Sequence, residues 1–357
     1  VTVSAVAEGI DTTSAKIAPV VTRAELDALP VPGRDFSSLA ALVPGVTSVG
    51  GGNVAAGGQE SNQTGYLLDG VNNTAPNLGN ARGSVTLESV QEFQVITNQF
   101  SAEYGQASGA VVSAITRGGT NTTRGRAFLF FSDDGLNAGD PFASGAKAPF
   151  SQQRYGGFVG GPIRRDRLFY FASIETIRAR TTNVVVSPLA QPDQLQYTQK
   201  DDRPQPFGRV DWNISPTQSF WVRYRFDRDS SKGAGIGGLN TVSRGYNNYE
   251  TNQDVTVFHG YVPSSRILNE FRFSGGYRHL VRDSIGFDPN APGYDMANFT
   301  INRPSGNLGP QANTNWLTKA PTYIFTENFS FFTGGHSIKL GAEVQLYRGG
   351  LGSPTNV

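Results

Sequence analysis

The chain has 357 residues with a formal net charge of +1, 38% hydrophobic and 17% charged residues, 43 glycines and 23 phenylalanines. Low charge with abundant aromatics and glycines is typical of an all-β protein with many turns and argues against a disordered chain. The balanced charge gives no electrostatic footprint for nucleic acid. With no cysteine in the sequence, disulfides, thiolate zinc sites and cysteine nucleophiles are excluded.

No segment approaches the ~20 apolar residues of a membrane-spanning helix. At the N-terminus no basic region is followed by an apolar stretch, so no signal peptide is visible. We therefore expect either a chain that is not exported or a mature or incomplete chain.

Residues 1 to about 118 predict a mixed α/β unit that begins with a short strand or extended tail, "VTVSAV", and continues with two helices. Thr22 and Glu25 have the spacing of a capping box, so a helix is expected to start there. A second helix is expected with Asp35 as its N-cap and with Pro44 and Gly45 as its stop.

Strand signals follow in the same unit. Residues 66–68 are strand-like, and Asp69 with Gly70 is a strong signal for a hairpin turn. The stretch "TLESVQEFQVIT" predicts a short helical turn that runs into a strand. After a glycine-punctuated bend, a further strand is expected over residues 110–116.

After residue 118 the pattern changes to segments of about ten residues in which apolar and polar side chains alternate, a period typical of half-buried antiparallel strands. In "SFWVRYRFDRD", for example, Val222 and Tyr224 share one face while Arg223 and Arg225 share the other. We count nine such segments: "RAFLFFS", "RYGGFVGGPI", "RLFYFASIETIR", "PFGRVDWNIS", "SFWVRYRFDRD", "QDVTVFHGYV", "NEFRFSGGYRH", "TYIFTENFSFF" and "SIKLGAEVQLY".

Two architectures fit this alternation, a soluble β-sandwich or barrel and an outer-membrane barrel. Segment lengths of about ten match tilted membrane strands better than the usual ~5–6 of soluble proteins. The connections also alternate between tight ones such as "SPTQ" and long ones such as "SSKGAGIGGLNTVSRGYNNY". Both observations favour an outer-membrane barrel with short periplasmic turns and long outer loops.

Three stretches together resemble the plug domain of TonB-dependent outer-membrane receptors, closest to the Oar-like group. They are "LPVPGRDFSSLAALVPGV", "GYLLDGVNN" and "ESVQEFQVITNQFSAEYGQASGAVVSAITRGGTN". The following "RGRAFLFF", "RYGGFVGGPIRRDRLFYF" and "VDWNIS" resemble the first barrel strands of that group. The resemblance covers nearly the whole chain, with long motifs in order.

The resemblance implies a plug inside a 22-stranded barrel in the bacterial outer membrane. It also implies active import of a scarce ligand, driven by a TonB-type inner-membrane energising complex that pulls on an N-terminal peptide. Only 239 residues (357 − 118) follow Gly118, so we expect an incomplete barrel of about nine strands. The expected organisation is a mixed α/β plug at 1–118, then antiparallel transmembrane strands at 119–357, in a chain truncated at both ends.

Motifs for other chemistry are weak. Gly233, Gly235 and Gly238 have G-x-G-x-x-G spacing, but no helical period follows, so a loop is expected rather than a dinucleotide site. The "SDDGLNAGD" stretch offers oxygen ligands that could hold calcium, although a plain turn is the simpler interpretation. The histidines lack ligand spacing: His259, His279 and His336. We expect no cofactor, no metal site and no catalytic site.

Candidate functional residues fall into three groups. An extended peptide that could add to a sheet edge of the TonB-type partner is Val1, Thr2 and Val3, with a linker or first plug strand as the alternative. The candidates for plug structure or gating are Tyr66, Asp69, Gly70, Glu103, Tyr104, Gly105 and Gly109. The charges predicted to face the barrel lumen, either paired or solvated, are Arg209, Asp211, Arg223, Arg225, Asp227, Glu270 and Arg272.

The predicted function is energy-coupled uptake of a metal chelate, vitamin, oligosaccharide or peptide, with outer-membrane lipid around the barrel. Aromatic-rich loops such as "SRGYNNY" permit a carbohydrate ligand. The alternatives are a surface-structural or adhesive barrel without transport, and a soluble glycan-binding β-protein. We expect no nucleic-acid partner and no enzymatic activity.

Overall fold

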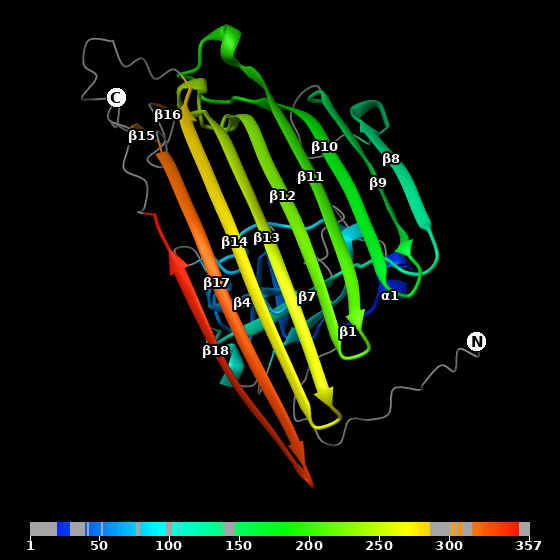
Figure 1. Ribbon diagram of the computed structural model, residues 1–357. Helices are drawn as coiled ribbons and strands as arrows, with labels where there is room; N and C mark the ends of the chain where they lie inside the picture. The colour runs from blue at the N-terminus through cyan, green and yellow to red at the C-terminus, as the bar shows by residue number, and fades with distance from the viewer. Residues whose placement is uncertain are drawn as a thin grey trace. The chain divides into compact units, whose positions relative to one another are not determined.

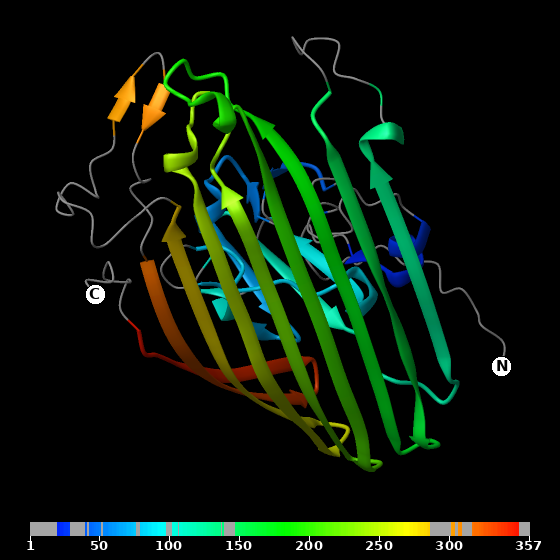
Figure 2. The same cartoon turned by 90° about the horizontal axis from the view of Figure 1, so that it is seen from above.

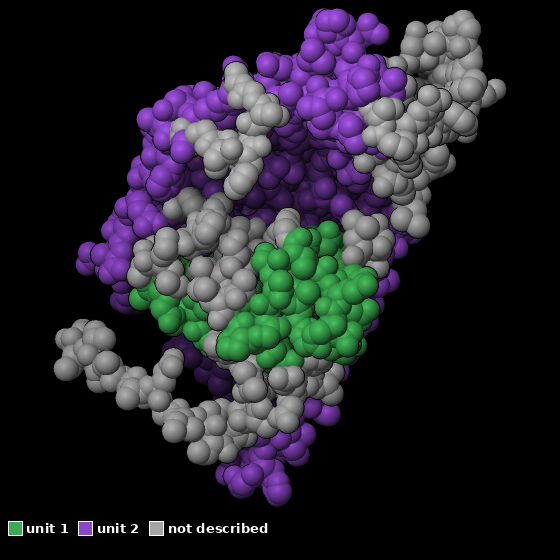
Figure 3. Space-filling view, turned by 180° about the vertical axis from the view of Figure 1, so that it is seen from behind, with its two compact units in different colours: residues 1–81, 90–116 green, residues 82–89, 117–357 purple. Residues whose placement is uncertain are grey.

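The computed structural model describes residues 20–28, 40, 43–50, 53–75, 79–97, 102–105, 107–136, 138, 147–285, 301–303, 306–308 and 316–349. These residues form two compact units, shown in separate colours in Figure 3. The first unit comprises residues 1–81 and 90–116, and the second comprises 82–89 and 117–357. Residues 82–89 thus group with the second unit, although they precede the last two strands of the first in sequence. The predicted domain boundary at residue 118 stays a prediction.

The first unit contains a five-stranded mixed sheet in the order β1-β6-β7-β4-β5. Its strands β4 and β7 are parallel, and the other pairs are antiparallel. Strand β7 is buried along nearly its whole length, including Val111 and Val112 on opposite faces. This explains why its sequence is an almost continuous apolar run and does not alternate. The bounds are β1 Val20–Val21, β4 Thr64–Leu68, β5 Val71–Asn72, β6 Val90–Ile96 and β7 Ala110–Thr116.

Short elements complete the first unit and confirm its predicted mixed α/β character. Helix α1 (Arg23–Ala28) follows β1, and a separate hairpin joins β2 (Val46–Gly50) to β3 (Asn53–Ala56). The helical turn predicted before β6 is the 3-10 helix η3 (Leu87–Ser89), which groups with the second unit. Most of the helix expected from Asp35 lies outside the described residues. Two further 3-10 helices are η2 (Ser61–Gln63) and η4 (Ala102–Tyr104).

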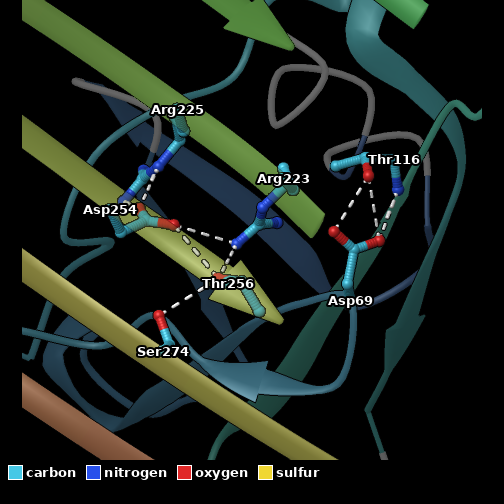
Figure 4. Close-up of polar contacts among 7 residues, drawn as sticks. All are labelled: Asp69, Thr116, Arg223, Arg225, Asp254, Thr256 and Ser274. Atoms are coloured by element: carbon cyan, nitrogen blue, oxygen red, sulfur yellow. Dashed lines mark hydrogen bonds and ion pairs between the residues drawn. The ribbon is translucent and has the colours of Figure 1, made fainter. Parts of the chain in front are cut away.

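A tight turn joins β4 to β5, as the Asp-Gly signal predicts. Asp69 and Gly70 both have positive φ angles, 53° and 77°, which is the backbone of a type I′ hairpin turn. The Asp69 carboxylate accepts hydrogen bonds from the Thr116 backbone N–H at 2.8 Å and from the Thr116 hydroxyl at 2.9 Å (Figure 4). This buried contact ties the turn to the end of the parallel neighbour β7.

The second unit is an antiparallel sheet of nine strands whose spatial order follows the sequence from β8 to β18 (Figures 1 and 2). The nine predicted segments are confirmed, and the described strands do not close into a barrel. A two-stranded ribbon, β15 (Ile301–Arg303) with β16 (Gly306–Leu308), interrupts the order in sequence. The long strands are β8 Arg124–Asp133, β9 Phe150–Arg164, β10 Leu168–Val184, β11 Gln196–Ser215, β12 Gln218–Ala234, β13 Tyr246–Ser264, β14 Ile267–Ser284, β17 Trp316–Thr333 and β18 His336–Tyr347.

Most of these strands are longer than the expected ten residues, and β11 reaches 20. In these longer strands, apolar and polar residues alternate over only part of the length. The strand then continues through residues that are mostly polar, which the alternation does not predict. The first strand also begins at Arg124, two residues before the predicted Arg126. No helix among the described residues is long and apolar enough to cross a membrane.

The two faces of the nine-stranded sheet differ in polarity. One face carries large apolar side chains that are exposed, including Ile174, Trp212, Tyr224 and Phe325. On the opposite face charged and hydroxyl side chains are buried, with Arg225 only 2% exposed. This arrangement inverts that of a soluble sandwich and matches a sheet whose apolar face contacts lipid.

The contact between Asp69 and Thr116 predicts a stability cost that double mutation can isolate. Asp69→Ala removes the acceptor of two hydrogen bonds and leaves a buried N–H unpaired, so unfolding of the first unit is expected to become easier by about 2 kcal/mol. Thr116→Val removes only the hydroxyl and is expected to cost less. The measurement is limited proteolysis of the intact receptor carrying each substitution or both. If the two losses of stability simply add in the double variant, the contact between Asp69 and Thr116 is contradicted.

The capping box at α1 predicts a pH dependence. The Thr22 backbone N–H donates to Glu25 Oε2 at 2.7 Å and the Thr22 hydroxyl donates to it at 2.9 Å, and these bonds lower the pKa of Glu25 from 4.5. Because the folded pKa is the lower one, the capping contribution is complete above the ordinary pKa and is lost as pH falls through the folded pKa. An NMR titration of the Glu25 carboxyl should give a midpoint below 4.5. A midpoint at or above that value would show that the hydrogen bonds from Thr22 do not stabilise the Glu25 carboxylate.

Candidate functional site

The polar face of the nine-stranded sheet holds residues 82–89, which we call the docked segment, and we call this face the inner face. The Ser84 backbone N–H donates to Asp227 Oδ2 of β12 at 3.2 Å. The hydroxyls of Ser89 and Ser173 of β10 lie 2.8 Å apart and are buried. The docked segment is therefore held by separate strands of the sheet through individual hydrogen bonds.

A buried carboxylate fixes the second half of the docked segment. The Glu88 side chain is 1% exposed, forms an ion pair with Arg126 of β8, and lies 3.9 Å from Arg117 Nη1. The Arg117 guanidinium in turn lies over the rings of Phe158 and Phe171, 4.1 Å and 5.1 Å from their centroids. A carboxylate with this little exposure needs such partners, because an unpaired buried charge is costly.

The first half of the docked segment approaches the sheet so closely that a side chain has no room. Gly83 has φ +147°, and a Cβ atom there would lie 2.5 Å from Arg225 Nη1 and 3.1 Å from Asn252 Cβ. At the neighbouring Arg82, burial lowers the pKa of the guanidinium, the Arg225 charge lowers it further, and Asp254 acts in the opposite direction. Arginine stays charged at such sites, so Arg82 belongs electrostatically to the ion cluster beside it.

That ion cluster centres on one aspartate between two arginines (Figure 4). Asp254 of β13 accepts hydrogen bonds from Arg223 Nη2 at 3.0 Å and from Arg225 Nε at 2.6 Å, both on β12. Arg223 also donates to the Thr256 hydroxyl at 2.8 Å, and Thr256 donates to Ser274 of β14 at 3.1 Å. Asp254 is 4% exposed, so the carboxylate and both guanidiniums depend on one another for charge compensation.

Nearer the short turns, two arginines cover a pair of stacked rings on the inner face. The rings of Trp221 and Phe258 are stacked with centroids 5.3 Å apart. The Arg209 guanidinium lies 4.5 Å from the centroid of Trp221, and that of Arg272 lies 4.9 Å from Phe258. Four neighbouring strands, β11 to β14, are linked by this row of cation–π and stacking contacts.

The strand register brings the seven predicted lumen charges to the inner face. Arg209 pairs with Asp211 at 2.7 Å and Arg272 with Glu270 at 2.9 Å, each along its own strand. Asp227 accepts from Gln205 Nε2 at 2.8 Å as well as from the docked segment. Most of these charges have protein partners, but their role in holding or releasing a plug stays a prediction.

Sequence reasoning missed the carboxylates that complete these contacts. Asp254 and Glu250, the latter 2.8 Å from Arg278, lie on β13, whose alternation was recognised without assigning its polar face. Applying the same period of two to "QDVTVFHGYV" places Asp254 and Thr256 together and could have found them. Glu88 carried no comparable signal, since a carboxylate in a short helical turn is ordinarily solvated.

The predicted plug residues divide between structural positions and exposed ones. Tyr66 is buried, and its hydroxyl accepts a hydrogen bond from the Val54 N–H at 3.0 Å, which joins β4 to β3. Gly109 packs closely, because a Cβ there would lie 3.1 Å from Gln59 Cβ. Glu103 and Gly105 are exposed and Tyr104 is half-buried, at η4. A gating role for Glu103 stays a prediction, and residues 1–3 lie outside the described residues.

The weaker motifs acquire no chemistry in the part of the chain that the structure describes. No group of three or more His, Cys, Asp or Glu side chains there could hold a metal ion. Of the three glycines with the G-x-G-x-x-G spacing, Gly233 lies at the end of β12, and Gly235 and Gly238 lie in the β12–β13 connection, where only the 3-10 helix η7 (Val242–Arg244) follows them. Two residues of the possible calcium loop, Asn137 and Asp140, lie outside the described residues.

Two family profiles match the chain over consecutive ranges. The family described as "Outer membrane beta barrel domain" matches residues 115–198 and 192–356. The "TonB-dependent Receptor Plug Domain" matches residues 11–112. The TonB-dependent transporter Oar of Myxococcus xanthus is 31% identical over 146 residues, which are 39% of this chain and 14% of that protein.

Solved structures share the fold. The outer membrane transporter YddB from Escherichia coli is similar over 91% of this chain and 47% of its own, with a TM-score of 0.70 at 11% identity. The siderophore receptor PirA from Acinetobacter baumannii covers 92% of this chain and 47% of its own, with a TM-score of 0.63 at 19% identity. The chain thus spans about half the length of these two structures.

The buried ion cluster and an exposed ion pair of the same sheet predict different costs. Asp254→Asn leaves two buried guanidiniums without their carboxylate, so a destabilisation of about 3–5 kcal/mol is expected. Asp202→Asn breaks the exposed pair between Arg178 and Asp202, 3.6 Å apart, and is expected to cost less than about 1 kcal/mol. Thermal unfolding of the intact receptor in detergent measures both, and equal shifts would contradict the structural role of Asp254.

Proposed function

Because the chain belongs to the TonB-dependent receptors of the bacterial outer membrane, whose plug and barrel domains it matches in order, we propose that it forms part of an importer. In this proposal it supplies the plug and the first barrel strands of a receptor that takes up a scarce small ligand. The observation that carries the proposal is the docked segment, which comes from the plug sequence and lies on the polar face of a sheet whose other face is apolar.

A closed polar passage explains the chemistry of the inner face. If the interior of the barrel were apolar, the buried charges of Arg223, Arg225 and Asp254 would cost desolvation energy without serving any purpose. A wall that a hydrated ligand passes needs polar side chains there, and these must be paired while the passage is closed. The contacts at Ser84, Glu88 and Ser89 hold the docked segment through a few polar groups, which water can replace when the segment moves.

The proposed energy source is a TonB-type inner-membrane complex that pulls on the plug from the periplasm. Hydrogen bonds contribute about 0.5–1.5 kcal/mol each when water can take over the partners. A pull that breaks the hydrogen bonds at Ser84 and Ser89 one after another therefore meets a low barrier at each of them, and the buried ion pair of Glu88 is the costliest contact to break until water reaches it. Residues 1–3 are the proposed partner-binding peptide, in which three consecutive β-branched side chains suit the addition of a strand to a sheet edge.

The ligand class stays open within the proposal. A metal chelate, vitamin, oligosaccharide or peptide each fits a polar passage, and Tyr246 and Tyr249, which lie at the start of β13, also permit a carbohydrate. Similarity to the siderophore receptor PirA is too distant in sequence to choose among these classes, because 19% identity shows the fold alone.

Import is tested by comparing three strains: the parent, a deletion of the receptor gene, and a deletion of the TonB gene. Mass spectrometry of the spent medium should find at least one compound that only the parent depletes. If the receptor deletion and the parent deplete every compound equally, the import proposal fails and a structural or adhesive barrel is favoured. Depletion that survives without TonB would retain transport but reject the proposed energy source.

A designed disulfide tests whether the docked segment must move. The Ser89 and Ser173 hydroxyls are 2.8 Å apart and the chain contains no cysteine, so Ser89→Cys with Ser173→Cys is expected to form one specific bond. The oxidised receptor should stop depleting the compound found above, and a reductant should restore depletion.

The single variant Ser89→Cys is the matched control and should behave as the parent in both conditions. Full depletion by the oxidised double variant, with the disulfide verified by mass spectrometry, would show that the docked segment stays on the wall during transport.

A further inference from the structure

Three cations lie side by side on the outer face, which is the apolar face of the nine-stranded sheet. Arg180 of β10 is directly opposite Lys200 of β11, and Lys200 is directly opposite Lys232 of β12. All three side chains are exposed. We call these three residues the basic row.

The strand register assigns the basic row to the outer face. One position along from Lys200 and Lys232, Asp201 is opposite Ser231. Further along the same two strands, Phe207 is opposite Arg225. Arg225 contacts the docked segment on the inner face, so residues in phase with it, such as Asp201, point inward. Lys200 and Lys232 are out of phase with Arg225 and therefore point outward.

Like charges directly opposite one another in a sheet repel and are destabilising. Here the arrangement occurs twice in succession, and none of the three cations forms an ion pair with a residue that the structure describes. The nearby acid Asp202 is already engaged, since its Oδ1 lies 3.6 Å from Arg178 Nε. The basic row thus concentrates positive charge at a place where the protein could have placed neutral residues.

The location of the basic row indicates what neutralises it. Toward the short turns of the same strands, the outer face becomes apolar, with Ile174, Trp212 and Tyr224 exposed. Toward the other end the strands lead into the longer connections, 185–195 and 235–245. The outward-facing Arg178 and Asp202 lie between the row and Ile174, so the row belongs to a charged zone beyond the apolar band, on the side of the longer connections. Charged side chains of a barrel wall meet lipid headgroups in such a zone.

An open pocket of about 490 Å³ adjoins the row and offers further donors. It is lined by Ser151, Gln153, Arg178, Arg180 and Lys200, together with the carboxylates of Asp201 and Asp202, which are engaged with Ser231 and Arg178 respectively. Hydroxyl, amide, guanidinium and ammonium groups in this combination are donors that suit phosphate oxygens. The lining comes from three neighbouring strands, β9 to β11, whose long side chains can adjust around such a group.

We propose that the basic row and its pocket bind the phosphate groups of an anionic lipid headgroup in the outer leaflet of the outer membrane. The lipid's acyl chains would lie against the apolar band while its phosphates neutralise Arg180, Lys200 and Lys232. The position of the row on the same face as the apolar band favours a lipid over a soluble polyanion, which would gain nothing from that band. The inference requires only the outer-membrane location, so it stands or falls separately from import.

The test uses the intact receptor purified in a neutral detergent and titrated with diphosphorylated lipid A in mixed micelles. Each cation near an anionic lipid surface contributes about fivefold in affinity, so Arg180→Gln with Lys200→Gln is expected to weaken binding about 25-fold. The matched control, Arg164→Gln with Arg165→Gln, removes two exposed cations at the β9–β10 turn and should stay within about twofold of the parent.

Two further arms identify the source of the phosphate. Dephosphorylated lipid A should bind the parent as weakly as diphosphorylated lipid A binds the double variant. Inorganic phosphate at the same concentration should not displace the lipid. Displacement by inorganic phosphate, tight binding of the dephosphorylated lipid, or equal affinity of parent and double variant would each overturn the proposal.

Thermal unfolding provides a check that does not depend on the binding assay. In neutral detergent the double variant should melt at or above the parent, because repulsion between the cations is relieved. Diphosphorylated lipid A should raise the Tm of the parent and of the control but not that of the double variant. If the double variant fails to fold, Lys232→Gln alone should weaken binding about fivefold, and an unchanged affinity would reject the proposal.

Discussion

Strand register is the constraint on which the second unit depends. Side chains alternate strictly between the two faces of a strand, so a slip by one residue would carry Arg223 and Arg225 to the apolar face. The same slip would separate both from Asp254, with which they form ion pairs across β12 and β13. Correct pairing of the backbone thus satisfies, at once, the hydrogen bonds of the strands and the charges of the inner face.

The docked segment adds a second level to this arrangement. By sequence, residues 82–89 lie in the middle of the first unit's strands, yet by contact they belong with the wall. Gly83 can lie against Arg225 only because it lacks a side chain, and Glu88 is tolerated in a buried position only because arginines from the wall reach it. A short piece of plug sequence is therefore shaped to the chemistry of particular wall residues.

The two faces use charge in opposite ways. On the inner face, Arg209 and Arg223 are directly opposite each other, but each forms an ion pair with a carboxylate, Asp211 and Asp254 respectively, so that charge is compensated within the protein. On the outer face, the basic row repeats one sign on three neighbouring strands. Compensation inside and accumulation outside are consistent with a wall that closes a polar passage on one side and meets anionic headgroups on the other.

The sequence by itself determined the class of fold and the positions of most elements. Alternation revealed all nine long strands, and the Asp69-Gly70 signal located the hairpin, because both depend on neighbours along the chain. Only the tertiary structure decided that Asp254 serves two arginines, that Glu88 is buried, and that Arg180, Lys200 and Lys232 stand in one row. Those facts depend on which residue of one strand faces which residue of the next, and such pairings join positions that are distant in sequence.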